Sequence, residues 1–417
     1  MPKKRYSLDI ALDVTQSNIL KRGIAFSSGL SVLNVFKGAE TLELGARGSF
    51  GRSADVAISE YGFDIQLRAP QFLLPFSNKI NKQKLAPLTI LRVGVGSQEN
   101  IGLDKQSLTG SIQYQWNPRE NRRWTFSFID VEFVNNKNKA NYFGVYNNAY
   151  DELNQIAGIT NTNPTYLLNE KLIIPQGAES FIGDVLVGNT SILPSDSSYQ
   201  RVQRIEERRR RLTQNNLIIS SGINFFSSSK RGIFDRSFTQ FRANLSWSGN
   251  LVEGLAKYFD WKQENGQYLL FEVPFSQFIK FETDFVKHWS VSNNQVMAVR
   301  AFAGAAFPYG NADNIPFNRS FFGGGAYDNR AWEVYRLGPG SSDSGNEFNE
   351  ANFKMSINIE YRFNLIGAFN GALFVDAGNI WNVYDNVNES ARRFDGFRDL
   401  DELAVGTGFG LRYDFGL

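Results

Sequence analysis

Long stretches of this chain alternate between apolar and polar residues with a period of two. In FKMSINIEYRF (353–363), one face carries Phe, Met, Ile, Ile, Tyr and Phe, and the other carries Lys, Ser, Asn, Glu and Arg. The same pattern recurs in YSLDIALDV (6–14), LTGSIQYQW (108–116) and VGTGFGLRYDF (405–415). Because successive side chains of a β-strand point to opposite faces, this period predicts a chain built of strands.

Two architectures explain such alternation: a soluble β-sandwich and a membrane-spanning β-barrel. Many of the alternating segments run for about 9 to 14 residues, longer than the usual globular strand and suited to a tilted crossing of a bilayer. Their polar faces carry charges that a dry sandwich core could not solvate, whereas a water-filled lumen could. Aromatic residues gather toward the ends of the apolar faces, as interfacial girdles require. We therefore expect an all-β, transmembrane, antiparallel up-and-down β-barrel.

The alternation predicts about fourteen strands. They are expected at residues 5–14, 23–36, 39–51, 60–69, 87–97, 106–117, 122–134, 216–227, 235–247, 267–290, 295–307, 352–363, 371–381 and 404–415. The connections after even-numbered strands are mostly short, whereas the long ones, at 136–215, 308–351 and 382–403, follow odd-numbered strands. Short turns at one rim and long loops at the other are typical of outer-membrane barrels. Pro70 and Pro75 in RAPQFLLPF (68–76) cannot donate to a ladder, so this piece should end the fourth strand at the rim.

The composition excludes several classes of site. The chain has no cysteine and a single histidine, His288, so a thiolate site, a disulfide framework or a histidine-based metal site is not expected. We expect His288 to be a hydrogen-bonded structural residue. Lys and Arg total 44 against 42 Asp and Glu, a balance that does not point to nucleic acid. No window reaches the roughly 18 uninterrupted apolar residues of a membrane-spanning helix.

The longest predicted connection, 136–215, is expected to be an extracellular loop with short helices. YNNAYDELNQIAG (146–158) and QRVQRIEERRRRL (200–212) have helical composition, and the second is strongly basic. Two interpretations of the basic helix remain open. It is either a solvated surface helix stabilised by its own Glu–Arg pairs, which is favoured, or a binding patch for lipopolysaccharide or a partner.

At 321–340 the chain reads FFGGGAYDNRAWEVYRLGPG, with glycines at both ends and an arginine among aromatic residues. This stretch resembles the signature loop of the BamA/TamA family of outer-membrane assembly barrels, also called the bacterial surface antigen family. Three further segments, LRAPQFLLPF (67–76), FVDAGNIW (374–381) and GTGFGLRYDF (406–415), resemble the family in the expected order. In the family tetrapeptide, Arg330 and Trp332 match, whereas Asn329 and Ala331 replace an aliphatic residue and a glycine.

The resemblance implies a sixteen-stranded barrel whose loop between strands eleven and twelve folds back into the lumen. It also implies that Arg330 pairs with acidic residues of the inner wall at two motif positions, Glu360 and Asp376. A buried arginine needs carboxylates to offset its desolvation, so we expect this pairing to pin the loop in a structural role. The glycines expected to turn the chain as it enters and leaves the lumen are Gly323, Gly324, Gly325, Gly338 and Gly340. The glycines at 406–410 are expected to permit close packing on the lumen side or bending of the strand.

The function implied by the resemblance is assembly, insertion or translocation of other proteins at the outer membrane of a Gram-negative bacterium. The seam between the first and last strands would open and template client strands by β-augmentation. The implied partners are outer-membrane lipids, unfolded outer-membrane protein clients and accessory assembly proteins. No cofactor, metal or catalytic residue is implied. The sequence contains neither a G-x-S-x-G elbow nor a P-loop, so we do not expect an enzyme.

The same resemblance predicts that the chain is a barrel fragment of about fourteen strands. Family members carry periplasmic POTRA domains before the barrel and two more strands after the GLRYDF motif. The basic start MPKKRYSLDIALDV alternates at once, unlike a signal peptide, so the chain is either cytoplasmic or a fragment whose export signal lies upstream. Two functional alternatives stay open: a passive porin for small solutes and a dedicated secretion pore for one partner protein.

Overall fold

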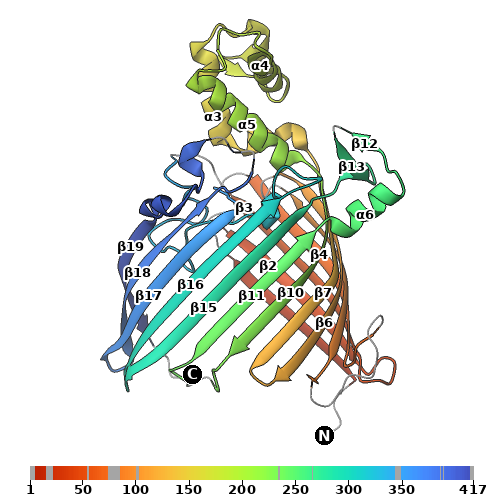
Figure 1. The fold of residues 1–417 in the computed structure, drawn as a ribbon, viewed down its shortest axis with the longest axis vertical. Coiled ribbons are helices and arrows are strands. Elements are labelled where there is room, and N and C mark those ends of the chain that lie inside the picture. The colour runs from red at the N-terminus through yellow and green to blue at the C-terminus, as the bar shows by residue number, and fades with distance from the viewer. Residues whose placement is uncertain are drawn as a thin grey trace.

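The computed structural model describes residues 5–15, 22–53, 56–73, 85–99, 103–232, 235–264, 266–342, 349–385, 387 and 389–413. In this part of the chain, one fourteen-stranded antiparallel sheet wraps into a barrel (Figure 1). Every strand pairs with its neighbour in sequence order, as in an up-and-down barrel. The first and last strands, β1 and β19, form the two edges of the described sheet.

The strands of the barrel are long, as a tilted crossing of a membrane requires. They are β1 (Tyr6–Thr15), β2 (Arg22–Leu33), β3 (Thr41–Ser53), β4 (Val56–Ala69), β5 (Leu88–Glu99), β6 (Lys105–Arg119), β7 (Arg122–Asn136), β10 (Asn216–Ser228), β11 (Thr239–Ser248), β15 (Phe278–Ser292), β16 (Gln295–Pro308), β17 (Phe353–Ile366), β18 (Phe369–Trp381) and β19 (Ala404–Tyr413). None of the helices in the described ranges is long and apolar enough to span a membrane.

Each of the fourteen predicted strands has a counterpart, but the prediction at 267–290 was wrong in its extent. The chain there forms β13 (Gln267–Leu270), turns, continues as β14 (Val273–Pro274) and enters the barrel only at β15. Phe271 and Glu272 adopt φ of 53° and 62°, so a tight turn interrupts the stretch. Pro274, which cannot donate to a ladder, is the sequence sign of this break that the prediction overlooked. The predicted strand at 235–247 begins later, at Thr239, because Asp235 first closes a turn by accepting backbone hydrogen bonds.

The apolar rows of the strands face the outside of the barrel. Ile359, Val375 and Phe409 on three adjacent strands are 39, 43 and 58% exposed. The alternate row points inward, where Lys354 and Glu360 of β17 contact the chain inside the lumen. Two stacked sheets would have buried the apolar rows instead, so the sandwich alternative is excluded and the predicted barrel is confirmed.

The four longest connections leave the same rim of the barrel, here called the loop rim, which lies at the top of Figure 1. Besides the three predicted connections, a fourth spans 249–277 and contains α6 (Asn250–Tyr258), β12 (Gln263–Glu264), β13 and β14. It was missed because most of it was assigned to the strand predicted at 267–290. Pro70 directly follows β4, as predicted, whereas Pro75 lies outside the described residues.

The connection from β7 to β10 folds into a small helical module. It contains η1 (Lys139–Asn141), α2 (Tyr142–Val145), α3 (Asn147–Ile159), η2 (Pro164–Tyr166), β8 (Leu167–Leu168), β9 (Lys171–Leu172), α4 (Gln176–Val187) and α5 (Ser197–Thr213). The predicted helices at 146–158 and 200–212 are confirmed as α3 and α5, whereas α4 was missed. Leu153, Phe181 and Val202 are buried in one apolar cluster that joins α3, α4 and α5.

The basic helix α5 is only partly the solvated surface helix that was favoured. Arg209 and Arg210 pair with Glu206 of the same helix, as that interpretation requires. However, Glu206 and Arg208 are themselves buried, and other arginines of α5 bind carboxylates elsewhere in the fold. These pairs are Arg201 with Glu152, Arg204 with Glu389 and Arg211 with Glu350. The helix therefore joins its module to the neighbouring loops.

Candidate functional site: a luminal loop bound to the barrel wall

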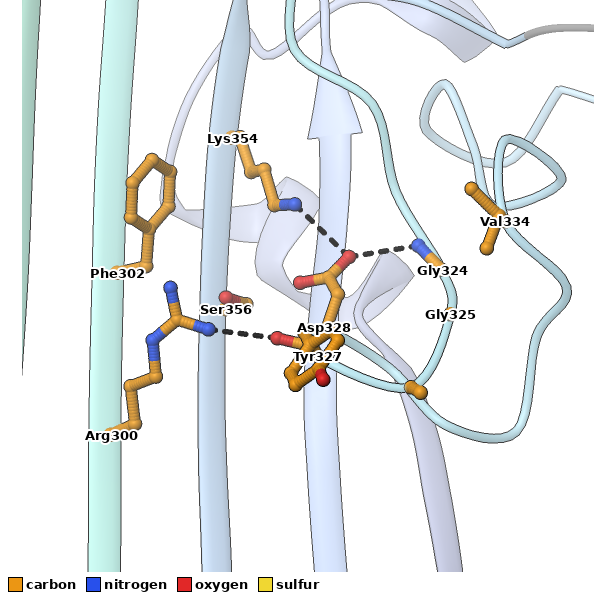
Figure 2. A pocket seen from close by; sticks show the side chains of 10 residues that line it. Arg300, Phe302, Gly324, Gly325, Tyr327, Asp328, Val334, Lys354 and Ser356 are labelled. Atoms are coloured by element: carbon orange, nitrogen blue, oxygen red, sulfur yellow. Dashed lines mark hydrogen bonds and ion pairs between the residues drawn. The ribbon is translucent and has the colours of Figure 1, made fainter. Parts of the chain in front are cut away.

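The connection from β16 to β17, residues 309–352, folds back against the inner wall and is here called the luminal loop. Its base is held by a short antiparallel bridge, in which Phe321 and Ala351 exchange backbone hydrogen bonds of 2.7 and 3.0 Å. Its other described elements are η3 (Phe317–Arg319) and the tip at residues 324–335. Figure 2 shows this tip beside Arg300 and Lys354, which project from β16 and β17. The loop lies between strands eleven and twelve of the sheet.

Arg330 at the tip binds two carboxylates of the wall. Its Nε and Nη2 donate to the two oxygens of Asp376 at 2.8 and 2.7 Å, and its Nη1 donates to Glu360 Oε2 at 2.5 Å. The backbone N–H of Arg330 also donates to Asp376 at 3.0 Å. Asp376 is fully buried and Glu360 nearly so. These charge-assisted bonds, two of them a parallel fork, offset the cost of removing the three charges from water.

A stacked aromatic ring supports the same guanidinium group. Phe374 of β18 points into the lumen, and the Arg330 guanidinium carbon lies 3.6 Å from the centre of its ring. The opposite residue on β19 is Gly408, and a Cβ at that position would overlap the ring. The glycine therefore gives the ring its space, as the prediction of close packing at 406–410 anticipated.

Glu360 accepts hydrogen bonds from three arginines. Besides Arg330, Arg362 of β17 and Arg412 of β19 each donate to its Oε1 at 2.7 Å. The three arginines come from the loop, from the strand that carries the carboxylate and from the edge strand of the sheet. Three positive charges thus surround Glu360 and Asp376, which makes this part of the lumen net positive.

The residue before Arg330 attaches the tip to the edge strand. Asn329 is buried, and its side-chain amide donates to the carbonyl oxygen of Ala404 at 2.7 Å. A Cβ at Gly406 would lie 2.5 Å from the Cβ of Ala331. Ala331, which replaces the family glycine, therefore fits because its neighbour on β19 has no side chain. The two departures from the family tetrapeptide are both accommodated by contacts with β19.

A second set of contacts holds the tip against β16 and β17. Asp328 pairs with Lys354 at 3.0 Å and accepts the backbone N–H of Gly324 at 2.8 Å. Arg300, which forms a fork with Asp284, also donates to the carbonyl oxygen of Tyr327 at 2.8 Å (Figure 2). Of these residues, all but Asp284 line a cavity of about 340 Å³ between the tip and the wall.

Four of the five predicted hinge glycines have left-handed backbone. The φ values are 92° at Gly324, 99° at Gly325, 70° at Gly338 and 56° at Gly340. At Gly324 and Gly340 an added Cβ would also overlap a backbone carbonyl oxygen, that of Glu333 and that of Ala391 respectively. Gly323 has no positive φ and instead forms a bridge with Leu337, so the prediction that it turns the chain was wrong.

Unlike Arg330, Trp332 and His288 form no ion pair in the part of the chain that the structure describes. Trp332 is half-buried and fixes the tip through its backbone, which exchanges hydrogen bonds with Asn329 and Gly325. His288 stacks on Phe238, with the ring centres 4.3 Å apart. Its ring makes no hydrogen bond within the described residues, so the expected hydrogen-bonded histidine is a stacked one.

The prediction missed several residues of this site, including Asn329, Phe374, Arg362 and Arg412. The two arginines lie on the polar rows of their strands, so the alternation alone places them in the lumen. The sequence does not show the strand register. That register places an arginine of β17 and an arginine of β19, two strands that are not neighbours, beside the same carboxylate. Asn358 was missed for the same reason: it lies opposite Asp376 and donates to it at 2.9 Å.

Together these features define a class of protein: an outer-membrane β-barrel with a luminal loop bound by ion pairs to the wall. The chain belongs to the Omp85 superfamily, because the Omp85 superfamily domain matches residues 3–417.

The known proteins that are similar to this chain include two BamA proteins. The outer membrane protein assembly factor BamA of Neisseria meningitidis is 35% identical over 100 residues, which are 21% of this chain and 12% of that protein. A crystal structure of BamA from Haemophilus ducreyi lacking POTRA domains 1–3 has a TM-score of 0.56 at 12% identity, over 99% of this chain and 64% of that one. The chain thus spans less than two thirds of the proteins it matches, and the structural likeness shows the shared fold.

Proposed function

We propose that this domain belongs to a protein that inserts other proteins into the outer membrane or moves them across it. The observation that supports this proposal is that the luminal loop binds the last two strands of the described sheet, β18 and β19. Arg330 binds Asp376 on β18, and Asn329 binds Ala404 on β19. The loop tip therefore lies beside one edge of the barrel rather than across its centre.

The edges themselves supply the second part of the proposal. Within the described residues, β1 pairs only with β2 and β19 only with β18, so each has one row of backbone groups without a strand partner. Such groups cannot stay unpaired in lipid, which drives an edge to pair with an incoming strand. A client strand that adds to the first strand, β1, would extend the same antiparallel ladder.

The luminal loop favours this function over a passive porin. A porin needs an open polar lumen with a constriction, whereas here the loop fills space between the inner faces of β16, β17, β18 and β19. The proposed partners are outer-membrane lipids, unfolded outer-membrane proteins and accessory assembly proteins. The proposed activity is strand templating, which needs no catalytic residue. In the same proposal, the loop rim with its 137–215 module faces the cell exterior.

Site-specific photocrosslinking in the full-length parent tests the proposal. A photoreactive amino acid replaces Ile10, which is exposed on the edge strand β1, and in a second strain replaces Ile357, which is exposed on β17, a strand paired on both sides. We expect newly made outer-membrane proteins to crosslink at position 10 and not at position 357. Equal yields at the two positions would contradict a role for the edge.

Depletion of the parent separates the proposed function from a dedicated exporter. Loss of an assembly factor should lower the amounts of many outer-membrane barrels, because each needs the same templating edge. Loss of an exporter should remove one secreted partner and leave the barrels unchanged. The second outcome would replace the proposed function.

A further inference from the structure

The connection at 249–277, with α6 and the β12–β13–β14 sheet, lies against the outer face of the barrel wall. Val252 of α6 and Phe275 are buried with Leu217 of β10, and the outward-facing residues Val131 and Phe133 of β7 pack against them. Between those two, Glu132 faces the lumen, where it binds Arg319 of the luminal loop at 2.7 Å. Figure 1 shows α6 outside the wall, level with the ends of the strands at the loop rim.

Helix α6 exposes an apolar stripe on the side away from the barrel. Leu251, Leu255 and Tyr258 are spaced by four and three residues, so they share one face of the helix. They are 60, 50 and 82% exposed. Phe259, directly after the helix, extends the stripe. A helix surrounded by water on this face would carry polar residues there.

The polar residues of α6 gather on a different face. Glu253 pairs with Lys257 at 2.6 Å and also accepts a hydrogen bond from Gln277 at 2.6 Å. The helix thus has three sectors: a buried one against the wall, a polar one and an exposed apolar one. This is the pattern of a helix that rests at a boundary between water and hydrocarbon.

The wall strands next to the start of α6 also expose apolar residues on their outer face. Lys280 of β15 lies over Phe321 of the luminal loop and so faces the lumen, which places its neighbours Ile279 and Phe281 on the outside. On the adjacent strand β11, Leu245 faces the same side and is exposed, and α6 begins just after that strand ends. A helix packed on this wall, at this height, meets the polar–apolar boundary of the membrane leaflet at the loop rim.

We propose that α6 is an interfacial membrane helix, which inserts Leu251, Leu255, Tyr258 and Phe259 among the acyl chains just beneath the lipid headgroups. The occupant of the stripe is lipid. The site lies on strands seven to nine of the fourteen-stranded sheet, so it is remote along the sheet from both edges. It anchors the wall that lies farthest from β1 and β19.

The absence of cysteine from the chain allows a direct test. Single-cysteine variants Leu255→Cys and Tyr258→Cys carry an environment-sensitive fluorophore, and the protein is reconstituted into vesicles of phosphatidylcholine and phosphatidylethanolamine. Lipids with a nitroxide near the headgroup or near the chain end quench the fluorophore according to its depth. Because both leaflets contain the quencher, the orientation of the barrel does not matter. Retention of the folded form on unheated SDS gels checks each variant.

Two control positions match these sites. Lys257→Cys reports the polar face of the same helix, and Val187→Cys reports an equally exposed apolar residue, 77% exposed, on the helical module beyond the rim. We expect the shallow nitroxide to quench positions 255 and 258 about threefold more than position 187, with position 257 between them. Equal quenching at 255 and 187 would overturn the proposal and leave the stripe for a protein partner. Stronger quenching by the deep nitroxide than by the shallow one would overturn the interfacial placement.

Discussion

Arg330 stacks on Phe374 at 3.6 Å while two carboxylates bind the edges of its guanidinium group. The loop tip is therefore held on three sides by residues of β17 and β18. No single contact accounts for its position.

Replacing Arg330 with alanine should destabilise the barrel by about 3 kcal/mol, because it leaves the buried Asp376 without its cation. Arg330→Lys should recover part of this loss, since a lysine restores the charge but not the fork. The measurement is resistance to heat and SDS unfolding. Arg47→Ala is the matched control, because Arg47 pairs with Asp64 at 3.9 Å on an exposed site and should cost under about 1 kcal/mol. Unchanged resistance in Arg330→Ala, with the loop still in the lumen, would contradict the pinning role.

Gly408→Ala should push the Phe374 ring out of its place under Arg330 and cost about 1 to 3 kcal/mol. Gly410 on the same strand offers a matched control, because a Cβ there would lie 3.7 Å from its nearest neighbour, an ordinary contact. Urea unfolding of both variants measures the difference. If the two alanine variants are equally stable, the packing of the ring against β19 does not matter to the site.

Single-channel recordings in planar bilayers should show small, irregular openings for the unmodified domain, because the loop occupies part of the lumen. Arg330→Ala should raise the frequency of larger openings, whereas Arg47→Ala should not. A wide and steady pore in the unmodified domain would favour the porin.

The helical module should lose stability in acid. Burial alone would raise the pKa of Glu206, but hydrogen bonds from Arg209 and Arg210 outweigh it and hold the pKa below the ordinary value of 4.5. Such a carboxylate contributes stability that is complete above its unfolded pKa and is lost as pH falls through the folded one. The far-ultraviolet circular dichroism signal of the helices should therefore weaken as the pH falls through the folded pKa of Glu206, which lies below 4.5. Glu206→Gln should flatten this acid dependence, whereas Asp151→Asn, at an exposed position of α3, should not.

The strands could be predicted because lipid on one side and water on the other constrain every residue of a crossing. The position of the turn at Phe271 and Glu272 could not, because those residue types are not typical of a tight turn, although Pro274 already argues against one continuous strand there. Helix α4 was missed for a related reason: QGAESFIGDVLV contains two glycines and too few polar residues to show a helical stripe. Both elements depend on packing that is specific to their own loops.

The candidate site was likewise predicted only in part. Arg330, Glu360 and Asp376 could be named from the family resemblance, together with the argument that a buried arginine requires acidic partners. The contribution of Arg412 could not, because it depends on the register of two strand pairs in succession. The wall residues that pack against α6 could not be predicted either, because the helix itself was not predicted.

The sharing of Glu360 among three arginines links the loop to the edge of the sheet. If β19 moves away from β18, Arg412 leaves the carboxylate, and Arg330 and Arg362 no longer compete with it for the same negative charge. Detachment of β19 then strengthens the binding of Arg330 to Glu360. Withdrawal of the loop likewise strengthens the binding of Arg412 to Glu360, since such coupling is reciprocal. Glu360 thus makes it unfavourable for β19 to detach and for the luminal loop to withdraw at the same time. An open edge and an empty lumen are therefore a disfavoured combination.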